Sequence, residues 1–252
     1  MSKALDSLVR ERYAKAVAQG ALLFSESTVH LKKEKGVQFE IRYVPALAKK
    51  PNAKPKESLE SKGFVNPFLP HDERLFVASL GTSHNLLMNK YCVVPYHLLI
   101  TTVGFEQQGD LLTESDFNAV LDVCNNMSRQ HIVFYNSGEE SGASQPHKHL
   151  QLLPMPEYIG MPPLLSLWRS EKPLPGAVYT SASLPFSNFG VLLGNAPYTP
   201  SMLLGAYSSA LKALTDIHGQ TASYNMLLVA DALVLFPRQH NKWHGVGVNS
   251  LG

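Results

Sequence analysis

Three side chains spaced two residues apart are the first candidates for chemistry in this sequence: His147, His149 and Gln151. In an extended strand, side chains at alternate positions leave the same face of the sheet. A neutral imidazole is a competent nucleophile near pH 7 because its reference pKa is about 6.5. Attack on a phosphorus atom gives a phosphoramidate that can pass its group to a second acceptor. The spacing therefore indicates covalent chemistry on a phosphate ester or anhydride.

A loop of small residues leads into these side chains. Residues 141–144 read Ser-Gly-Ala-Ser, and Gln145 follows. The transition state of phosphoryl transfer spreads negative charge over the phosphoryl oxygens, which fixed N–H groups stabilise. Gly142 and Ala143 let the backbone approach a ligand closely. We predict that the N–H groups of this loop bind phosphate and that Gln151 adds a neutral amide donor.

Two other interpretations of the histidine pair stay open at this point. A histidine on a strand is often an ordinary structural residue. An HxH pair is also half of a zinc site, which His84 or His97 could complete. The only cysteines are Cys92 and Cys124, too few for a CxxC metal site or a disulfide framework. We expect no bound metal.

Composition narrows the class of protein. The chain has 252 residues, of which 44% are hydrophobic and 17% charged, with a net charge of +2. These values are ordinary for a globular protein and indicate no general affinity for nucleic acid. The N-terminus lacks an apolar signal core, and no apolar run is long enough to span a membrane. We expect a cytoplasmic protein without membrane or nucleic-acid partners.

Hydrophobic periodicity predicts an α+β fold with a mainly antiparallel sheet flanked by helices, in a single domain spanning 1–252. Thr113, with Asp116 three residues on, predicts a capping box for a helix running to about Gln130. The other expected elements are a helical N-terminal extension (1–36), a strand (37–43), a lysine- and proline-rich loop (45–70), three strands (75–102), a strand (132–135), a proline-rich, mostly irregular crossing (154–200), a helix (200–218) and two paired strands (224–229 and 233–237).

The segment around the histidines resembles a known family. YNSGEESGASQPHKHLQLLP (135–154) is similar to the diadenosine tetraphosphate phosphorylases, also called ATP adenylyltransferases. That family lies in the galactose-1-phosphate uridylyltransferase branch of the histidine-triad (HIT-like) superfamily. Further segments look like the family in the same order: NPFLPHDERLFV (66–77), SHNLLMNK (83–90), FEQQGDLLTESDF (105–117), LPFSNF (184–189) and YNMLLVADALVLFPRQH (224–240).

The resemblance implies a HIT-like fold and a role for each matching residue. His149 would be the nucleophile that becomes adenylylated, His147 would support it, and Gln151 would contact the α-phosphate in place of a third histidine. The implied substrate-binding residues are Lys50, Asn89, Lys90, Asn136, Gly142, Ala143, Ser144, Gln145, Asn225 and Arg238. A lysine near Lys50 would meet the distal phosphates. Apart from the resemblance, the lysines between 49 and 62 could attract a small polyphosphate by their charge; the alternative is a solvated loop.

The implied reaction is reversible and ping-pong. The histidine attacks the α-phosphorus of diadenosine tetraphosphate and releases ATP, and inorganic phosphate then takes the AMP to give ADP. The expected ligands are therefore diadenosine polyphosphates, ATP, ADP, AMP and phosphate, with no tightly bound cofactor and Mg²⁺ only in company with the polyphosphate. The resemblance extends to an ADP-sulfurylase activity. Two alternatives are a non-catalytic sensor of dinucleoside polyphosphates and a uridylyltransferase acting on sugar phosphates.

Overall fold

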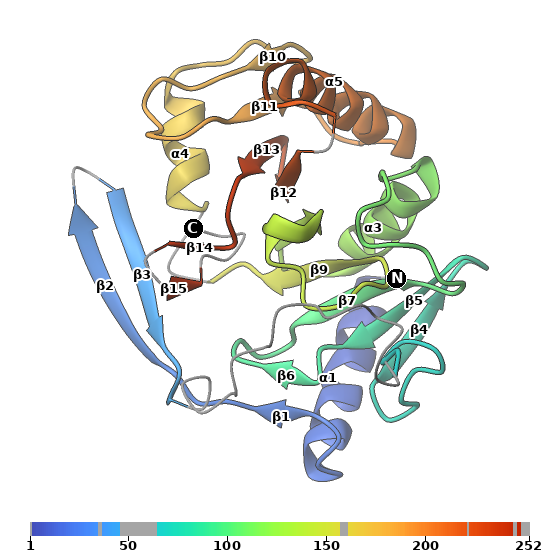
Figure 1. The fold of residues 1–252 in the computed structure, drawn as a ribbon. Helices are drawn as coiled ribbons and strands as arrows, with labels where there is room; N and C mark the ends of the chain where they lie inside the picture. Colours follow the sequence, from blue (N-terminus) through green and yellow to red (C-terminus); the bar gives the residue numbers. More distant parts are fainter. Residues whose placement is uncertain are drawn as a thin grey trace.

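A nine-stranded antiparallel sheet forms the centre of the molecule, in the order β10-β11-β13-β12-β8-β9-β7-β5-β4 (Figure 1). The computed structural model describes residues 2–34, 37–45, 65–156, 161–220, 222–243 and 246–247. The strands of the sheet are β4 (Phe76–Leu80), β5 (His84–Met88), β7 (Leu98–Thr102), β8 (His131–Ser137), β9 (His149–Pro154), β10 (Val178–Tyr179), β11 (Phe189–Leu192), β12 (Ser223–Val229) and β13 (Ala232–Arg238).

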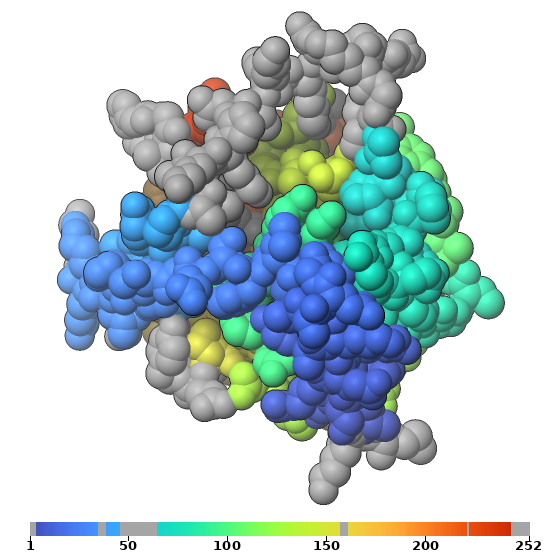
Figure 2. Space-filling view, turned by 90° about the horizontal axis from the view of Figure 1, so that it is seen from below, coloured from blue at the N-terminus to red at the C-terminus, as the bar shows by residue number. Residues whose placement is uncertain are grey.

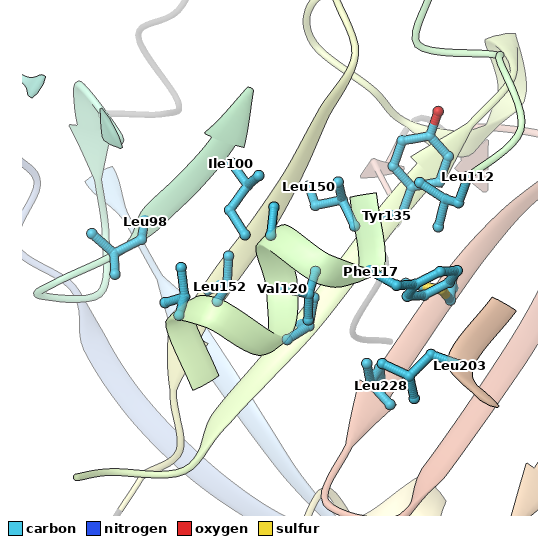
Figure 3. Close-up of a cluster of buried hydrophobic side chains, with 14 of the residues drawn as sticks. Leu98, Ile100, Leu112, Phe117, Val120, Tyr135, Leu150, Leu152, Leu203 and Leu228 are labelled. Atoms are coloured by element: carbon cyan, nitrogen blue, oxygen red, sulfur yellow. The ribbon is translucent and has the colours of Figure 1, made fainter. Parts of the chain in front are cut away.

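Three helices cover one face of this sheet. They are α1 (Ser2–Ala18), α3 (Glu114–Asn126) and α5 (Pro200–His218). Alternate residues of β7 and β9, such as Ile100 and Leu150, contribute to a buried cluster that also contains Phe117 and Val120 of α3 (Figure 3). Because side chains of a strand alternate between faces, the intervening residues, which include His149 and Gln151, leave the opposite face.

The opposite face carries a second apolar cluster beneath α4 (Pro163–Ser170). Trp168 of this helix is fully buried in that cluster and contacts the sheet at Gly190 of β11. Phe134 of β8 and Leu153 of β9 belong to the same cluster. The candidate site therefore lies on a face that is apolar beneath α4 and polar near the start of β9.

A separate hairpin extends from the body of the molecule (Figures 1 and 2). Its strands are β2 (Thr28–Glu34) and β3 (Val37–Tyr43), which pair only with each other among the described strands. Several of its apolar side chains are exposed, Leu31 by 55% and Ile41 by 50%. A cavity of about 840 Å³ separates the hairpin from α4, with Phe39, Ile41 and Phe186 among its walls.

The remaining short strands form two separate two-stranded sheets. β1 (Leu23–Phe24) pairs in parallel with β6 (Tyr91–Cys92), and β14 (Lys242–Trp243) pairs with β15 (Val246–Gly247). Within the described ranges, no helix is long and apolar enough to cross a membrane.

The predicted α+β class with a mainly antiparallel sheet is confirmed, as are most of its elements. The capping box at Thr113 and Asp116 is present, although α3 ends at Asn126, before Gln130. Two regions differ from expectation. The N-terminal helix ends at Ala18, and residues 28–34 form a strand because they pair with β3 along their whole length. The crossing at 154–200 contains α4, β10 and β11, since its apolar residues pack on the sheet.

Candidate active site

His149 is the first residue of β9 and is 3% exposed. Its Nδ1–H donates a hydrogen bond to the carbonyl oxygen of His147 over 2.8 Å. A carbonyl oxygen can only accept, so the neutral ring carries its proton on Nδ1 and a lone pair on Nε2. Among the residues that the structure describes, none hydrogen-bonds to Nε2. This is the tautomer that an imidazole nucleophile requires.

His147 precedes the strand and pairs with Gln107 in an isolated bridge, so the three predicted residues do not share one continuous strand. The reason is that β9 pairs with β7 and β8 only from His149 onward. Both nitrogens of the His147 ring are engaged: Nε2–H donates to the carbonyl oxygen of Thr102 (3.0 Å), and Nδ1 accepts from Nδ2 of Asn66 (2.9 Å). His147 is thus a fixed neighbour of His149.

Phe68 joins the two imidazoles. Its ring centroid lies 5.5 Å from that of His147 and 5.4 Å from that of His149. Phe68 is 7% exposed and belongs with Asn66 to the NPFLP segment. Sequence reasoning noticed this segment but assigned it no role. Its ring packs against one side of both imidazoles.

Gln151 is oriented by a residue that sequence reasoning considered only as a zinc ligand. Nε2–H of His97 donates to Oε1 of Gln151 (3.0 Å), and Nδ1 of His97 accepts from Nδ2 of Asn89 (3.1 Å). With its oxygen bound to His97, the side chain of Gln151 has its NH₂ group available as a donor. Asn89 therefore acts on the site through His97, since its own oxygen accepts from the N–H of Tyr91.

Burial keeps these imidazoles neutral at pH 7. It lowers the pKa of His149 to about 4; the hydrogen bond to the His147 carbonyl offsets part of this effect, and the nearby His147 ring adds to it. Burial is also the main cause that lowers the pKa of His97 to about 4. The pKa of His147 is lowered by burial as well. A neutral His149 retains its lone pair across the physiological range.

A second polar group lies on the neighbouring strands. Asn136 of β8 pairs in register with Asn225 of β12. Nδ2 of Asn225 donates to Oδ1 of Asn136 (2.9 Å) and to the carbonyl oxygen of Ser141 (2.8 Å), while Arg238 donates to Oδ1 of Asn225 (2.7 Å). The register between β8 and β9 ends at Phe134 and Gln151, and beyond it Nε2 of Gln108 donates to the carbonyl oxygens of both Asn136 (2.8 Å) and His149 (3.2 Å). The structure thus brings these predicted residues together near His149.

The small-residue loop offers unsatisfied donors. Gly142 has a φ of 81°, a left-handed conformation that favours glycine. The N–H of Ala143 is bound to Oγ of Ser141 (3.4 Å). For the N–H groups of Ser144 and Gln145, no acceptor exists among the described residues. Neighbouring free N–H groups of this kind form an anion-binding concavity.

The far face of the histidine segment holds a buried charge network. Lys148 is 1% exposed, and its Nζ donates to Asp116 (2.8 Å) and Glu106 (3.0 Å). Asp116 also pairs with Nε2 of His84 (2.9 Å). Burial alone raises the pKa of Asp116, but its hydrogen bonds to His84, Lys148 and Thr113 lower it to about 2. Lys148 therefore anchors the backbone between the two histidines from behind.

The last two predicted substrate-binding residues are lysines. Lys50 lies outside the described residues. Lys90 is exposed, with its Nζ 5.7 Å from the ring centroid of Tyr91.

In the described part of the chain, the histidines considered for a zinc site are not gathered as ligands. His84 lies on the far face with Asp116, and both ring nitrogens of His147 are bound to protein groups. Within the described ranges, no group of three or more His, Cys, Asp or Glu side chains could hold a metal ion.

Comparison with known proteins agrees with this geometry. The family model "Ap4A phosphorylase N-terminal domain" matches residues 1–165, and "ATP adenylyltransferase C-terminal domain" matches residues 182–252. Diadenosine tetraphosphate phosphorylase 2 of Saccharomyces cerevisiae is 31% identical over 237 residues, which cover 81% of this chain and 70% of the relative. Protein APA1 of the same yeast is 29% identical and covers 98% of this chain and 84% of its own.

Solved structures of the yeast Ap4A phosphorylase Apa2 superimpose on nearly all of the chain. The complex with diadenosine tetraphosphate (Ap4A) has a TM-score of 0.83 and 28% identity, covering 98% of this chain and 86% of that one. The complex with AMP has a TM-score of 0.83 and covers 98% and 85%. Because the first family model alone spans more than half of the residues, the protein belongs to the Ap4A phosphorylase family of ATP adenylyltransferases.

Proposed function

We propose that this protein cleaves Ap4A with inorganic phosphate to ADP and ATP through an adenylyl-histidine intermediate. Nε2 of His149 attacks the α-phosphorus, an N–P bond forms, and the P–O bond to the departing ATP breaks. An oxygen of inorganic phosphate then attacks the same phosphorus, and the N–P bond breaks as ADP forms. The observation that carries this proposal is the hydrogen bond from Nδ1–H of His149 to the His147 carbonyl, which leaves Nε2 nucleophilic.

The same hydrogen bond supports the intermediate. Adenylylation at Nε2 places positive charge on the ring, and the carbonyl oxygen bound to Nδ1–H lies where it stabilises that charge. The NH₂ group of Gln151 and the free N–H groups of Ser144 and Gln145 are neutral donors suited to the phosphoryl oxygens. The crystal structures of Apa2 with AMP and with Ap4A give the ligand class in the family.

The arrangement favours transfer to phosphate over hydrolysis. Hydrolysis of the intermediate needs a base that activates water. Gln151 is a neutral amide, and the Nδ1 lone pairs of His147 and His97 accept from Asn66 and Asn89. Inorganic phosphate arrives as an anion and needs no base at its attacking oxygen. Mg²⁺ enters this proposal only as a counter-ion of the polyphosphate, and the cytoplasm is the proposed location.

The test separates the two half-reactions. The protein is incubated with Ap4A in the absence of phosphate, and the adduct is located by mass spectrometry of peptides. We expect one AMP on His149, release of one ATP per chain, and formation of ADP on adding phosphate. His149→Ala should form no adduct, whereas His30→Ala, which changes an exposed histidine on β2, should label like the wild type.

Three outcomes contradict the proposal. Equal labelling of His149→Ala would show that the nucleophile lies elsewhere. Binding of Ap4A with neither adduct nor ADP would identify a sensor. A preference for UDP-sugars over Ap4A in parallel assays would identify a uridylyltransferase.

A further inference from the structure

The buried side chain of Gln108 lies between β8 and β9 at the point where their pairing stops. The strands pair in register from His131 and Pro154 to Phe134 and Gln151. Continuing that register would bring Asn136 opposite His149, but no direct pair is made there. Gln108 is 5% exposed and fills this position.

One amide group binds three backbone groups of the two strands. The N–H of His149 donates to Oε1 of Gln108 (2.8 Å). Nε2 of Gln108 donates to the carbonyl oxygens of Asn136 (2.8 Å) and His149 (3.2 Å). The orientation of the amide follows from these partners, because an N–H requires an acceptor and two carbonyl oxygens require a donor. Gln108 thus replaces the backbone hydrogen bonds that a direct pair would make.

Gln108 is itself held at its backbone. Its N–H donates to the carbonyl oxygen of Pro146 (2.7 Å), and its own carbonyl oxygen accepts from the hydroxyl of Tyr135 (2.6 Å). The segment that carries it therefore has little freedom to move relative to β9. A buried amide with every polar group bound is a rigid support.

We infer that Gln108 is a positioning residue for the proposed adenylyl transfer: it fixes the backbone of the nucleophile His149 and holds β8 apart from β9 beside it. Side chains of a directly paired position lie about 5 Å apart. Inserting an amide between the strands widens this separation, and it does so between the attacking imidazole and Asn136. This inference rests on the function proposed above.

Substitution by glutamate tests the amide specifically. In Gln108→Glu, one carboxylate oxygen still accepts from the His149 N–H, but the other meets two carbonyl oxygens without a proton to donate. Protonation of the carboxyl restores one donor. We expect adenylylation by Ap4A, measured as a single turnover without phosphate, to be at least about 100-fold slower than wild type at pH 8. Lowering the pH to 5.5 should recover about tenfold.

The matched control is Gln107→Glu, which adds the same charge on an exposed neighbouring side chain and should retain the wild-type rate. Gln108→Met keeps the length of the side chain but neither donates nor accepts, and should be slow at every pH. The titratable residues hydrogen-bonded to Gln108 are His149 and Tyr135. Burial lowers the pKa of His149 to about 4 and raises the pKa of Tyr135. Both stay neutral from pH 5.5 to 8, so a new titration belongs to the introduced carboxyl.

A purely structural role predicts a different pattern. The variants are assayed at a temperature at which circular dichroism shows them folded, and their AMP affinity is measured separately. Positioning predicts AMP affinity within about threefold of wild type despite the slow chemistry. The inference is overturned if Gln108→Glu reacts as fast as Gln107→Glu at pH 8, if its rate shows no recovery at pH 5.5, or if AMP affinity falls in parallel with the rate. Failure of the wild type to form any adduct would instead overturn the proposed function.

Discussion

The ring of His149 is hydrogen-bonded through Nδ1 to the backbone of His147, and its Nε2 has no hydrogen-bond partner among the described residues. The hydrogen bond to the His147 carbonyl selects the tautomer, and burial keeps the ring neutral. The two effects act together, because a protonated imidazole has no lone pair with which to attack phosphorus. Hydrogen bonds fix the side chains of His97 and Gln151 in the same way. His97 accepts at Nδ1 from Asn89 and donates at Nε2 to the oxygen of Gln151.

The first half-reaction should therefore vary little with pH. Ap4A has no terminal phosphate that titrates near neutrality, and the pKa of His149 is about 4. We expect the single-turnover rate of adenylylation to change less than about twofold between pH 5.5 and 8, whereas a histidine with a pKa of about 6.5 would lose roughly tenfold at the acid end. Rapid-quench measurement of released ATP checks this. An acid limb with a midpoint near 6.5 would contradict the neutral, buried nucleophile.

The site residues that the sequence predicted are close together in the sequence, whereas those that it missed come from other segments. His147, His149 and Gln151 lie within one short segment, so their spacing alone predicted their proximity. Asn66, Phe68 and His97 come from other segments and reach the histidines only through tertiary packing. Gln108 lay within a family-like motif, but its insertion between two strands has no signature in local sequence.

At the scale of elements, helices pack on both faces of the sheet. The close packing of α4 on β11 depends on one glycine. Gly190 in β11 leaves room for Trp168, and a Cβ at this position would lie 2.5 Å from the indole ring. The approach is close enough that α4 could not keep its position over a larger residue. Gly205 in α5 is the opposite case, since a Cβ there would meet nothing within 4 Å.

Substitution by alanine at these two glycines should change the stability of the protein in opposite directions. Gly190→Ala displaces Trp168 from a packed core and should lower the free energy of unfolding by about 1–3 kcal/mol. Gly205→Ala lies at an exposed position inside a helix and should raise it by about 0.5–1 kcal/mol, because alanine loses less backbone entropy. Urea unfolding followed by circular dichroism measures both. A neutral or stabilising Gly190→Ala would show that α4 does not pack closely on β11.

Elements with strong local signals were predictable, and those that depend on distant partners were not. The capping box of α3 and the run of α5 were read correctly from the sequence. Residues 28–34 carry lysines and few apolar side chains, so their strand is defined by pairing with β3. α4 was hidden by the surrounding prolines, one of which lies in its own first turn.

At the scale of the molecule, the buried, neutral histidines make the folded protein less stable as the pH falls. The pKa of His149 and of His97 is about 4 in the folded protein and about 6.5 when unfolded. Between these values the unfolded chain binds more protons, so the stability rises with pH and falls as pH drops from 6.5 towards 4.

When the pH is lowered from 7 to 5, we expect each of the two histidines to reduce the free energy of unfolding by on the order of 2 kcal/mol. Urea denaturation at the two pH values measures the difference. In His97→Gln, which removes one of the two groups, the pH-dependent difference should shrink by a similar amount. An unchanged difference in this variant would mean that His97 titrates normally in the folded protein.

The hydrogen bond between Asn225 and Asn136 joins the region matched by one family model to the region matched by the other. Because β12 and β8 are neighbours at the middle of a continuous sheet, the boundary between the two regions runs through the face that carries the candidate site. A gene split between them would therefore yield two polypeptides, each with an unpaired strand and half of the candidate site. Such halves would regain catalysis only by docking with each other.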